Sequence, residues 1–464
     1  MKEINIWAGR IRGEETAYPG VTVFRGIPYA APPVGALRWQ PPQPVPHWKR
    51  IRMCRQWPPM AYQPPQDAAP ESFRANEFYD NPFYLSEPSE DCLYLNVWTS
   101  AMRQGAGMPV AVWFHGGGFQ GGTSFEKPFD GEQFAKLGVV LVTVGYRCNV
   151  FGFFSCRELT MEQGSSGNYG LLDQLAALRW VHDNIAAFGG DPHCVTIFGQ
   201  GAGAVSVQTL VNSPLTAGLA HRAIMQSGGG YRNGMLPART QATAEEQGEL
   251  LYEAAGVSTL KELRDLPAPV LYEAGQRATA QWQARYGDAP VYAPVQDGKL
   301  LPAGYDECLR RGMTMDIDYM LGCTANDLTL PGGAPDALYQ GCLDWCRMQD
   351  ALGRKKGFAY QFVRQMPGDD AGAYHGSELW YMFGSAYRCW RPLSQADLEL
   401  STVMVRYWTN FIKTGNPNGP GLPEWPECDG TSETVQTLDV GLARVAVKHS
   451  SSKRRREYVI NPKR

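Results

Sequence analysis

The middle of the chain alternates short apolar runs with longer amphipathic stretches. Residues 110–114 (VAVWF) and 139–144 (VVLVTV) are continuously apolar, which is typical of central strands buried on both faces of a sheet. Residues 194–198 (CVTIF) form a third such run, and a glycine-rich turn and a helical pattern over 202–211 follow it. Residues 171–185 also have apolar side chains at helical spacing. Strands that alternate with helices in this way predict an α/β fold, in which helices cover both faces of a mostly parallel, twisted sheet.

The same periodicity predicts one late helix, whose apolar face consists of Leu400, Val403, Tyr407 and Phe411. This helix should end at the Gly-Asn-Pro sequence of residues 415–417, a strong C-terminal signal. Residues 56–90 are rich in Pro, Gln and Ser and predict an irregular surface excursion. No internal repeat or long low-complexity linker divides the chain, so we expect residues 1–464 to form a single domain.

Composition and charge exclude several classes of partner. The formal net charge is −3, which gives no reason to expect nucleic acid or an anionic membrane. The one basic cluster, residues 453–456 (KRRR), is interpreted as a solvated tail rather than a docking patch. No stretch approaches the roughly 20 apolar residues that span a bilayer, and the N-terminus has no apolar signal region. We therefore expect a cytoplasmic monomer or homodimer; the alternative is a protein from which a signal peptide was removed.

The cysteines give no metal-binding pattern. The chain has 11 cysteines, an odd number, and Cys342 and Cys346 are the one pair at helical spacing. No second pair or histidine lies nearby, so we predict neither a metal site nor a cofactor. The cysteines are expected to be reduced and mostly buried, as in cytosolic proteins.

The strongest local signal is the Gly-Gln-Gly-Ala-Gly sequence of residues 199–203, between a predicted strand and a predicted helix. In the nucleophile elbow G-x-S-x-G, the central residue occupies a strained turn, and the following helix directs its N-terminal dipole at the reacting oxygen. Both outer glycines are present here, but the central residue is Gly201. A phosphate-binding turn is the alternative. Ala204 stands where the last glycine of G-x-G-x-x-G belongs, and no acidic ribose partner follows, so we favour the elbow.

A second signal, the His-Gly-Gly-Gly sequence of residues 115–118, directly follows the run 110–114. It has the form of an HGGG-type oxyanion loop. Its glycines would leave the N–H groups of Gly116 and Gly117 free to bind a developing oxyanion, and the N–H of Ala202 would be the third donor. A plain glycine turn is the alternative, and the elbow later in the chain argues against it.

Further motifs stand in a fixed order along the chain: residues 24–30 (FRGIPYA), 32–35 (PPVG), 90–97 (EDCLYLNV), 168–174 (NYGLLDQ), 188–192 (FGGDP), 225–228 (MQSG) and 415–418 (GNPN). With the elbow and the glycine loop, they make the chain resemble the type-B carboxylesterase/cholinesterase family over nearly its full length. The resemblance implies an α/β-hydrolase fold. It also implies a serine esterase that hydrolyses small carboxylic esters through an acyl-enzyme, without a cofactor.

The resemblance also assigns the partners of the missing nucleophile. It makes His375 the catalytic base and Asp327 the acid, in the chain order nucleophile, acid, histidine. The family usually has Asp-Glu where this sequence has Asn326 and Asp327, so a carboxylate shorter by one methylene must sit closer to the histidine. Ser227 is expected to hydrogen-bond to the acid.

Other consequences of the resemblance are structural. Two buried ion pairs of the family map onto Arg38 with Glu90 and Arg147 with Asp173. Fewer residues separate the expected acid from the expected base than in the animal enzymes, so we expect shortened helices above the site and a more open mouth. An aromatic-rich substrate pocket is expected to be lined by Phe119, Tyr231, Trp380 and Phe383. The alternative, that these residues and Tyr381 belong to the core, stays open from the sequence.

Three explanations compete for Gly201. It is a deliberate Ser→Gly substitution that traps an intact ester, or a natural change in a pseudoenzyme that binds partners, as in the neuroligin-like adhesion members that also carry glycine there. In the third, Ser206 or Ser227 replaces the nucleophile. Ser206 lies more than a helical turn beyond the elbow, where the oxyanion donors would not face it, so we set the third aside. Because the loop, the base and the acid remain, and no secretion signal or anchor is visible, we favour an inactivated esterase over a binding or adhesion module.

Overall fold

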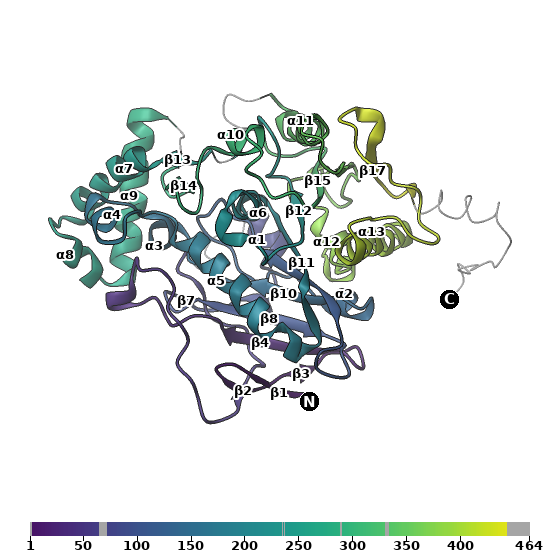
Figure 1. Ribbon diagram of the computed structural model, residues 1–464, viewed down its shortest axis with the longest axis horizontal. Coiled ribbons are helices and arrows are strands. Elements are labelled where there is room, and N and C mark those ends of the chain that lie inside the picture. Colours follow the sequence, from purple (N-terminus) through teal and green to yellow (C-terminus); the bar gives the residue numbers. More distant parts are fainter. Residues whose placement is uncertain are drawn as a thin grey trace.

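The computed structural model describes residues 2–64, 72–233, 235, 237–287, 290–329 and 334–442. A large sheet contains β3 (Glu14–Glu15), β4 (Thr22–Pro28), β8 (Tyr94–Thr99), β9 (Met108–Phe114), β10 (Val140–Val144), β11 (Gly190–Gln200), β12 (Arg222–Gln226), β15 (Asp318–Thr324), β16 (Phe358–Phe362) and β17 (Val435–Leu438). Its strands lie in the order β17-β16-β15-β12-β11-β9-β10-β8-β4-β3 (Figure 1). The basic cluster at residues 453–456 lies outside the described residues.

The large sheet is mostly parallel, as predicted. Parallel pairing runs without interruption from β10 through β9, β11, β12, β15 and β16 to β17. The strands β8, β4 and β3 pair antiparallel at the other edge. Parallel strands need crossover connections, and the helices in these connections cover the sheet.

Helices lie on both faces of the sheet (Figure 1). One apolar cluster joins the sheet to α5 (Tyr169–Asn184), α6 (Ala202–Asn212) and α11 (Ala337–Ala351). A second cluster joins the opposite face to α2 (Glu132–Lys136), α12 (Leu379–Met382) and α13 (Gln395–Thr414). The predicted α/β architecture is therefore confirmed.

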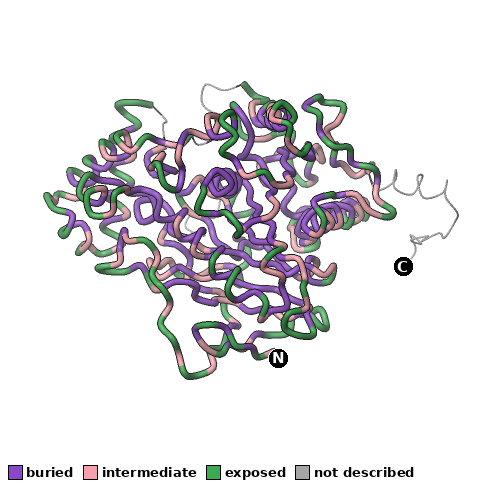
Figure 2. The backbone as a smooth tube through the Cα atoms, viewed as in Figure 1, coloured by how far each residue is buried: buried purple, intermediate pink, exposed green. Residues whose placement is uncertain are grey.

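The strand β9 shows why the central strands are apolar throughout. Its side chains alternate between the two clusters: Val110, Val112 and Phe114 belong to one, and Ala111 and Trp113 to the other. All five are completely buried, and Figure 2 shows the buried backbone concentrated in the middle of the sheet. A strand covered on both sides has no polar face, so its sequence shows no alternation.

The remaining elements surround this sheet. The additional helices are α1 (Phe73–Phe78), α3 (Asn149–Phe153), α4 (Arg157–Gln163), α7 (Gln241–Ala255), α8 (Leu260–Asp265), α9 (Ala268–Tyr286) and α10 (Tyr305–Arg310). Small sheets are formed by β1 (Glu3–Ile6), β2 (Gly9–Arg12) and β5 (Arg52–Met53), by β13 (Arg239–Thr240) and β14 (Val295–Gln296), and by β6 (Met60–Ala61) and β7 (Pro88–Ser89). The helices α7, α8 and α9 gather with α3 and α4 at one end of the molecule (Figure 1).

The observed elements agree with the prediction at the late helix and differ from it between residues 56 and 90. The late helix is α13, and it ends at Gly415, which has the expected left-handed conformation (φ 79°). The described part of residues 56–90 is more regular than the composition predicts, because it contains α1, which buries Glu77 and Phe78. Proline and glutamine are poor helix signals, and the burial of α1 depends on segments far away in the sequence.

The two mapped ion pairs are present and buried. Arg38 Nη2 lies 2.6 Å from Glu90 Oε2, and Arg147 Nη2 lies 2.7 Å from Asp173 Oδ1. Asp173 also accepts hydrogen bonds from Arg147 Nε and from the Arg147 backbone N–H. This clamp fixes the segment after β10 to the start of α5.

All 11 cysteines lie in the described ranges, and all are free. Cys342 and Cys346 are buried on α11, and no three His, Cys, Asp or Glu side chains in the described part of the chain are placed to hold a metal ion. Every described helix is too short or too polar to cross a bilayer.

We expect Asp173→Asn to lower the free energy of unfolding by about 3–5 kcal/mol, because it leaves the guanidinium of Arg147 buried without its counter-charge. The matched control is Asp344→Asn, which makes the same change in the exposed pair of Asp344 with Arg347. It should cost less than about 1 kcal/mol. Urea denaturation measures both, and equal losses would show that the buried clamp does not carry the stability assigned to it.

Candidate active site

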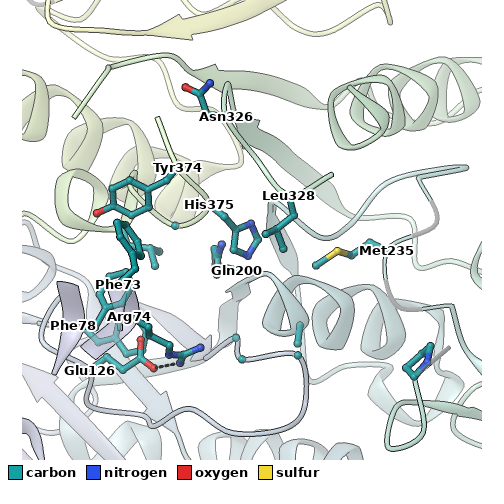
Figure 3. Close-up of a pocket in the computed structure, with 18 of the residues that line it drawn as sticks. Phe73, Arg74, Phe78, Glu126, Gln200, Met235, Asn326, Leu328, Tyr374 and His375 are labelled. Atoms are coloured by element: carbon teal, nitrogen blue, oxygen red, sulfur yellow. Dashed lines mark hydrogen bonds and ion pairs between the residues drawn. The ribbon is translucent and has the colours of Figure 1, made fainter. Parts of the chain in front are cut away.

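A cavity of about 950 Å³ opens at the carboxyl ends of the parallel strands (Figure 3). The loops after β9, β11, β15 and β16 all reach this edge of the sheet, because carboxyl ends of parallel strands lie together. The pairing register places Gly199 of β11 beside Phe114 of β9, and Gln200 beside Gln226 of β12. The glycine loop after β9 and the turn after β11 therefore meet at the cavity.

The turn between β11 and α6 has the geometry expected of an elbow. Gly201 has φ 58° and ψ −124°, a conformation that strains any residue with a Cβ, and its N–H donates to Gln226 O at 2.9 Å. A Cβ on Gly199 would lie 2.5 Å from the backbone of Gly203, and a Cβ on Gly203 would lie 2.0 Å from Phe114 O. Both outer positions therefore require glycine, since backbone atoms fill the space.

The imidazole of His375 faces position 201 on one side and Asp327 on the other. Its Nδ1 lies 2.5 Å from Asp327 Oδ1. A Cβ built on Gly201 would lie 3.0 Å from its Nε2. The structure thus brings together the three residues assigned as nucleophile position, acid and base, and a side chain at 201 would push the imidazole back by only a few tenths of an ångström.

The carboxylate of Asp327 is held in place by backbone donors. Its Oδ2 accepts from Thr324 N–H at 3.0 Å, and its Oδ1 accepts from Leu328 N–H at 2.8 Å. Burial opposes ionisation of this carboxyl, but the hydrogen bond and positive charge of His375 outweigh burial and lower its pKa. Ser227 lies next to it and contributes to lowering this pKa, although Ser227 Oγ makes no hydrogen bond of standard geometry to a described residue.

Asn326 joins the acid loop to the base loop, a role that the sequence did not reveal. Its N–H donates to Ala373 O at 3.0 Å, and its Oδ1 accepts from Ala373 N–H at 2.9 Å. The backbones of the two loops also pair as an isolated parallel β-bridge between Asn326 and Tyr374, the residue directly before His375. Asn326 therefore holds the loop that carries Asp327 against the loop that carries His375.

The three predicted oxyanion donors line the cavity. The N–H groups of Gly116 and Gly117 make no hydrogen bond to a described residue, and Ala202 is the first residue of α6, whose N–H has no partner within the helix. A Cβ on Gly117 (φ 108°) would lie 2.1 Å from Gly121 O, and one on Gly116 would lie 2.7 Å from Gln200 O. Glycine is thus required at both loop positions.

His115 supports this loop from behind. Its ring stacks on Tyr146 with ring centroids 4.3 Å apart, and Tyr146 Oη donates to His115 O at 2.7 Å. Burial lowers the pKa of His115 to about 4, so the ring is neutral at physiological pH. Its Nδ1 lies 2.8 Å from Gly116 O, which orients the peptide next to the free donors.

The aromatic residues predicted at the substrate pocket lie in the core instead: Phe119, Tyr231, Trp380 and Phe383. None of the four lines the cavity, and each is at most 4% exposed. Phe383, for example, packs edge-on against Trp113 of the sheet. The sequence does not show which face of α12 meets the sheet, so it left this choice open. The aromatic lining comes from Phe73, Phe78, Phe129 and Tyr374.

The sequence did not reveal two buried polar side chains that lie next to the predicted site residues. Gln200 lines the cavity beside Gly201, and its Nε2 is buried without a hydrogen bond to a described residue. Glu378 accepts from Gln226 Nε2 at 3.1 Å, and burial, with the charge of Asp327, raises its pKa to about 7. No motif singles out these positions, since only the fold brings them to the site.

The loop that carries His375 is also hydrogen-bonded to α1. Tyr374, next to His375, donates its hydroxyl to the buried carboxylate of Glu77. The same carboxylate accepts from Trp380 Nε1 at 3.0 Å and from Arg391 Nε at 3.1 Å. This network anchors the loop that carries the imidazole.

Comparisons with known proteins show to which family the chain belongs. The model of the carboxylesterase family matches residues 1–332 and 343–459. Carboxylesterase 1E of Mus musculus is 32% identical, over 91% of this chain and 87% of that protein, and carboxylesterase 1D of Rattus norvegicus is 33% identical, over 92% and 87%. A solved carboxylesterase of Geobacillus stearothermophilus superposes with a TM-score of 0.76 at 31% identity, over 96% of this chain and 99% of that one, and a thermophilic PNB esterase with 0.80 at 27%, over 95% and 96%. The chain therefore belongs to the type-B carboxylesterase family and has its α/β-hydrolase fold.

Proposed function

We propose that the cavity is the substrate site of a serine carboxylesterase in which Gly201 takes the place of the nucleophile. The observation that carries this proposal is the pairing of His375 with Asp327, directed at position 201. The relatives are carboxylesterases, which supports the same substrate class. As it stands, the chain binds small esters and turns them over very slowly.

With serine at position 201, each group has a role in acyl transfer. His375 Nε2 takes the hydroxyl proton as the oxygen attacks the ester carbonyl, and the N–H groups of Gly116, Gly117 and Ala202 bind the resulting oxyanion. His375 then passes the proton to the leaving alcohol, and an acyl-enzyme remains. A water molecule, activated by the same imidazole, releases the acid. Asp327 holds the imidazole in the required tautomer and stabilises its cation.

The glycine removes one reactant and leaves the surrounding site assembled. Loss of a catalytic serine lowers turnover on the order of a millionfold, with a residual rate from the oxyanion donors and binding. A binding or adhesion module is the alternative use of a site without a nucleophile. The retained carboxylate–imidazole pair favours the esterase, since a binding role needs no pair of groups that transfers protons.

Gly201→Ser should restore hydrolysis of p-nitrophenyl acetate with a burst of p-nitrophenolate, because the oxygen then lies against His375 Nε2. It should also lower the melting temperature, since a side chain in this left-handed turn costs about 1–3 kcal/mol. Stopped-flow absorbance and calorimetry measure the two effects. Gly201→Ala is the matched control: it brings the same strain without the hydroxyl and should stay inactive. A serine variant no faster than the alanine variant would refute the proposal.

In the Gly201→Ser background, Asp327→Asn should lower kcat by about 10⁴, because the amide favours the wrong imidazole tautomer. Steady-state kinetics with p-nitrophenyl acetate measure the loss. Asp316→Asn changes an exposed aspartate shortly before β15 and serves as the control, with kcat unchanged. A loss below about tenfold at position 327 would mean that another group orients the imidazole.

The raised pKa of Glu378 predicts that the free energy of unfolding falls as the pH rises. Its pKa is about 7 in the folded chain against an ordinary value of 4.5, so the folded state holds the proton more tightly. The corresponding stability is present below pH 4.5 and is lost as the pH rises to about 7, a change of about 3 kcal/mol. Glu378→Gln should therefore be more stable than the parent at pH 8 and similar at pH 4.5, as urea denaturation at the two pH values measures. An equal difference at both pH values would contradict this.

A further inference from the structure

The cavity contains one pair of charged side chains that the proposed acyl transfer does not use. Most of its lining is apolar, with Phe73 and Phe78 on α1, Phe129 shortly before α2, and Met235 and Leu328 elsewhere. Arg74 and Glu126 line the same cavity, and they are the only Arg, Lys, Asp or Glu residues among its described lining residues. Figure 3 shows the pair with Phe73 and Phe78 on one side of His375, while Met235 lies on the other side.

The guanidinium of Arg74 and the carboxylate of Glu126 contact each other through one atom of each group. Arg74 Nη2 donates to Glu126 Oε1 at 2.9 Å and to Tyr79 Oη at 3.2 Å. Tyr79 Oη donates to the same Oε1 atom of Glu126. Tyr79 is buried, so this triangle fixes the orientation of both charged groups.

Three of the five polar side-chain atoms of the pair make no hydrogen bond to a described residue. These atoms are Arg74 Nε and Nη1 and Glu126 Oε2. The side chain of Glu126 is only 7% exposed, whereas that of Arg74 is 45% exposed. Because both residues line the cavity, a ligand can donate to this free carboxylate oxygen, and a hydrogen bond to a charged acceptor is stronger than one between neutral groups.

The charges of the pair cancel, and this selects the chemistry of the ligand. A second carboxylate would gain the free nitrogens of Arg74 but would meet the oxygen of Glu126, and both anions would have to leave water. An uncharged group that accepts and donates at adjacent atoms fits both sides. A carboxamide has this form: its oxygen accepts from the guanidinium and its NH₂ donates to the carboxylate.

We infer that Arg74 and Glu126 form a specificity subsite for an uncharged donor–acceptor group, such as a terminal carboxamide, on the acyl or alcohol part of the ester. This inference rests on the proposed function, because the subsite belongs to the same cavity as His375. It adds a preference among esters that the carboxylate–imidazole pair cannot provide, since that pair contacts only the reacting atoms.

The test compares esters that differ only in one terminal group. One series consists of p-nitrophenyl esters of adipamic acid, adipic acid and 6-methylheptanoic acid, which end in carboxamide, carboxylate and isopropyl. The mirrored series consists of acetates of 6-hydroxyhexanamide, 6-hydroxyhexanoate and 6-methylheptan-1-ol. For Gly201→Ser, kcat/KM for the carboxamide should exceed that for the other two by about tenfold in one of the series, as expected for bonds to charged groups. A preference for the carboxylate, or no preference for the carboxamide in either series, would overturn the inference.

Glu126→Gln sharpens the test because it is nearly isosteric. It removes the counter-charge of Arg74 and replaces the free acceptor with an NH₂ donor, so the preference should move from the carboxamide to the carboxylate ester. Glu132→Gln makes the same change outside the cavity and should leave the preference as it was. An unchanged preference in Glu126→Gln would also overturn the inference.

Failure of the proposed function is distinguishable from failure of the subsite. If Gly201→Ser hydrolyses none of the six esters, the proposed esterase is wrong. The subsite is then judged on the Gly201 chain itself by thermal shift, since a bound ester raises the melting temperature. Stabilisation should again be greatest for a carboxamide ester and should be lost in Glu126→Gln; equal stabilisation by all six would reject the subsite.

Discussion

The site depends on how closely the turn at Gly201 is packed between neighbouring backbone segments. Gly203 leaves no space for a Cβ against Phe114 O, and a Cβ on Gly228 would lie 2.2 Å from Gly201 O. The Gly201 N–H is bound to Gln226 O, so the turn is fixed from both neighbouring strands. Because these are backbone contacts, the position of residue 201 in front of the imidazole is set by the sheet and not by the side chain it carries.

The acid and the base are positioned by a second backbone device. Asn326 bonds twice to Ala373, and Asp327 accepts two backbone N–H groups of its own loop. The shorter carboxylate still reaches the imidazole at 2.5 Å, since the two loops approach each other at this bridge. An aspartate at 326 could accept the same bond from Ala373 N–H, so the two loops are joined by this contact whichever of the two residues stands there.

The sequence predicted those parts of the site that depend on local backbone requirements. The elbow and the glycine loop were found because glycine is the one residue that fits such close approaches, and His375 and Asp327 because their motifs resemble a known family. The pocket walls were not found. Phe383 is as aromatic as Phe78, yet one packs against the sheet and the other lines the cavity, and only the tertiary placement of α12 and α1 decides this. The pairing of Glu126 with Arg74 was not predicted for the same reason. The two residues are 52 positions apart in the sequence, and only the fold brings them together.

Separate elements therefore hold the reacting groups and the groups that surround the substrate. His375 and Asp327 come from loops at the ends of β16 and β15, whereas Arg74 comes from α1 and Glu126 from the segment after β9. Glycine at 201 relieves the strain of the turn and removes a hydroxyl, but it touches none of the contacts between Arg74, Tyr79 and Glu126. Under the proposed function, a chain without a nucleophile keeps the means to choose among esters, because recognition and reaction share a cavity but no hydrogen bond.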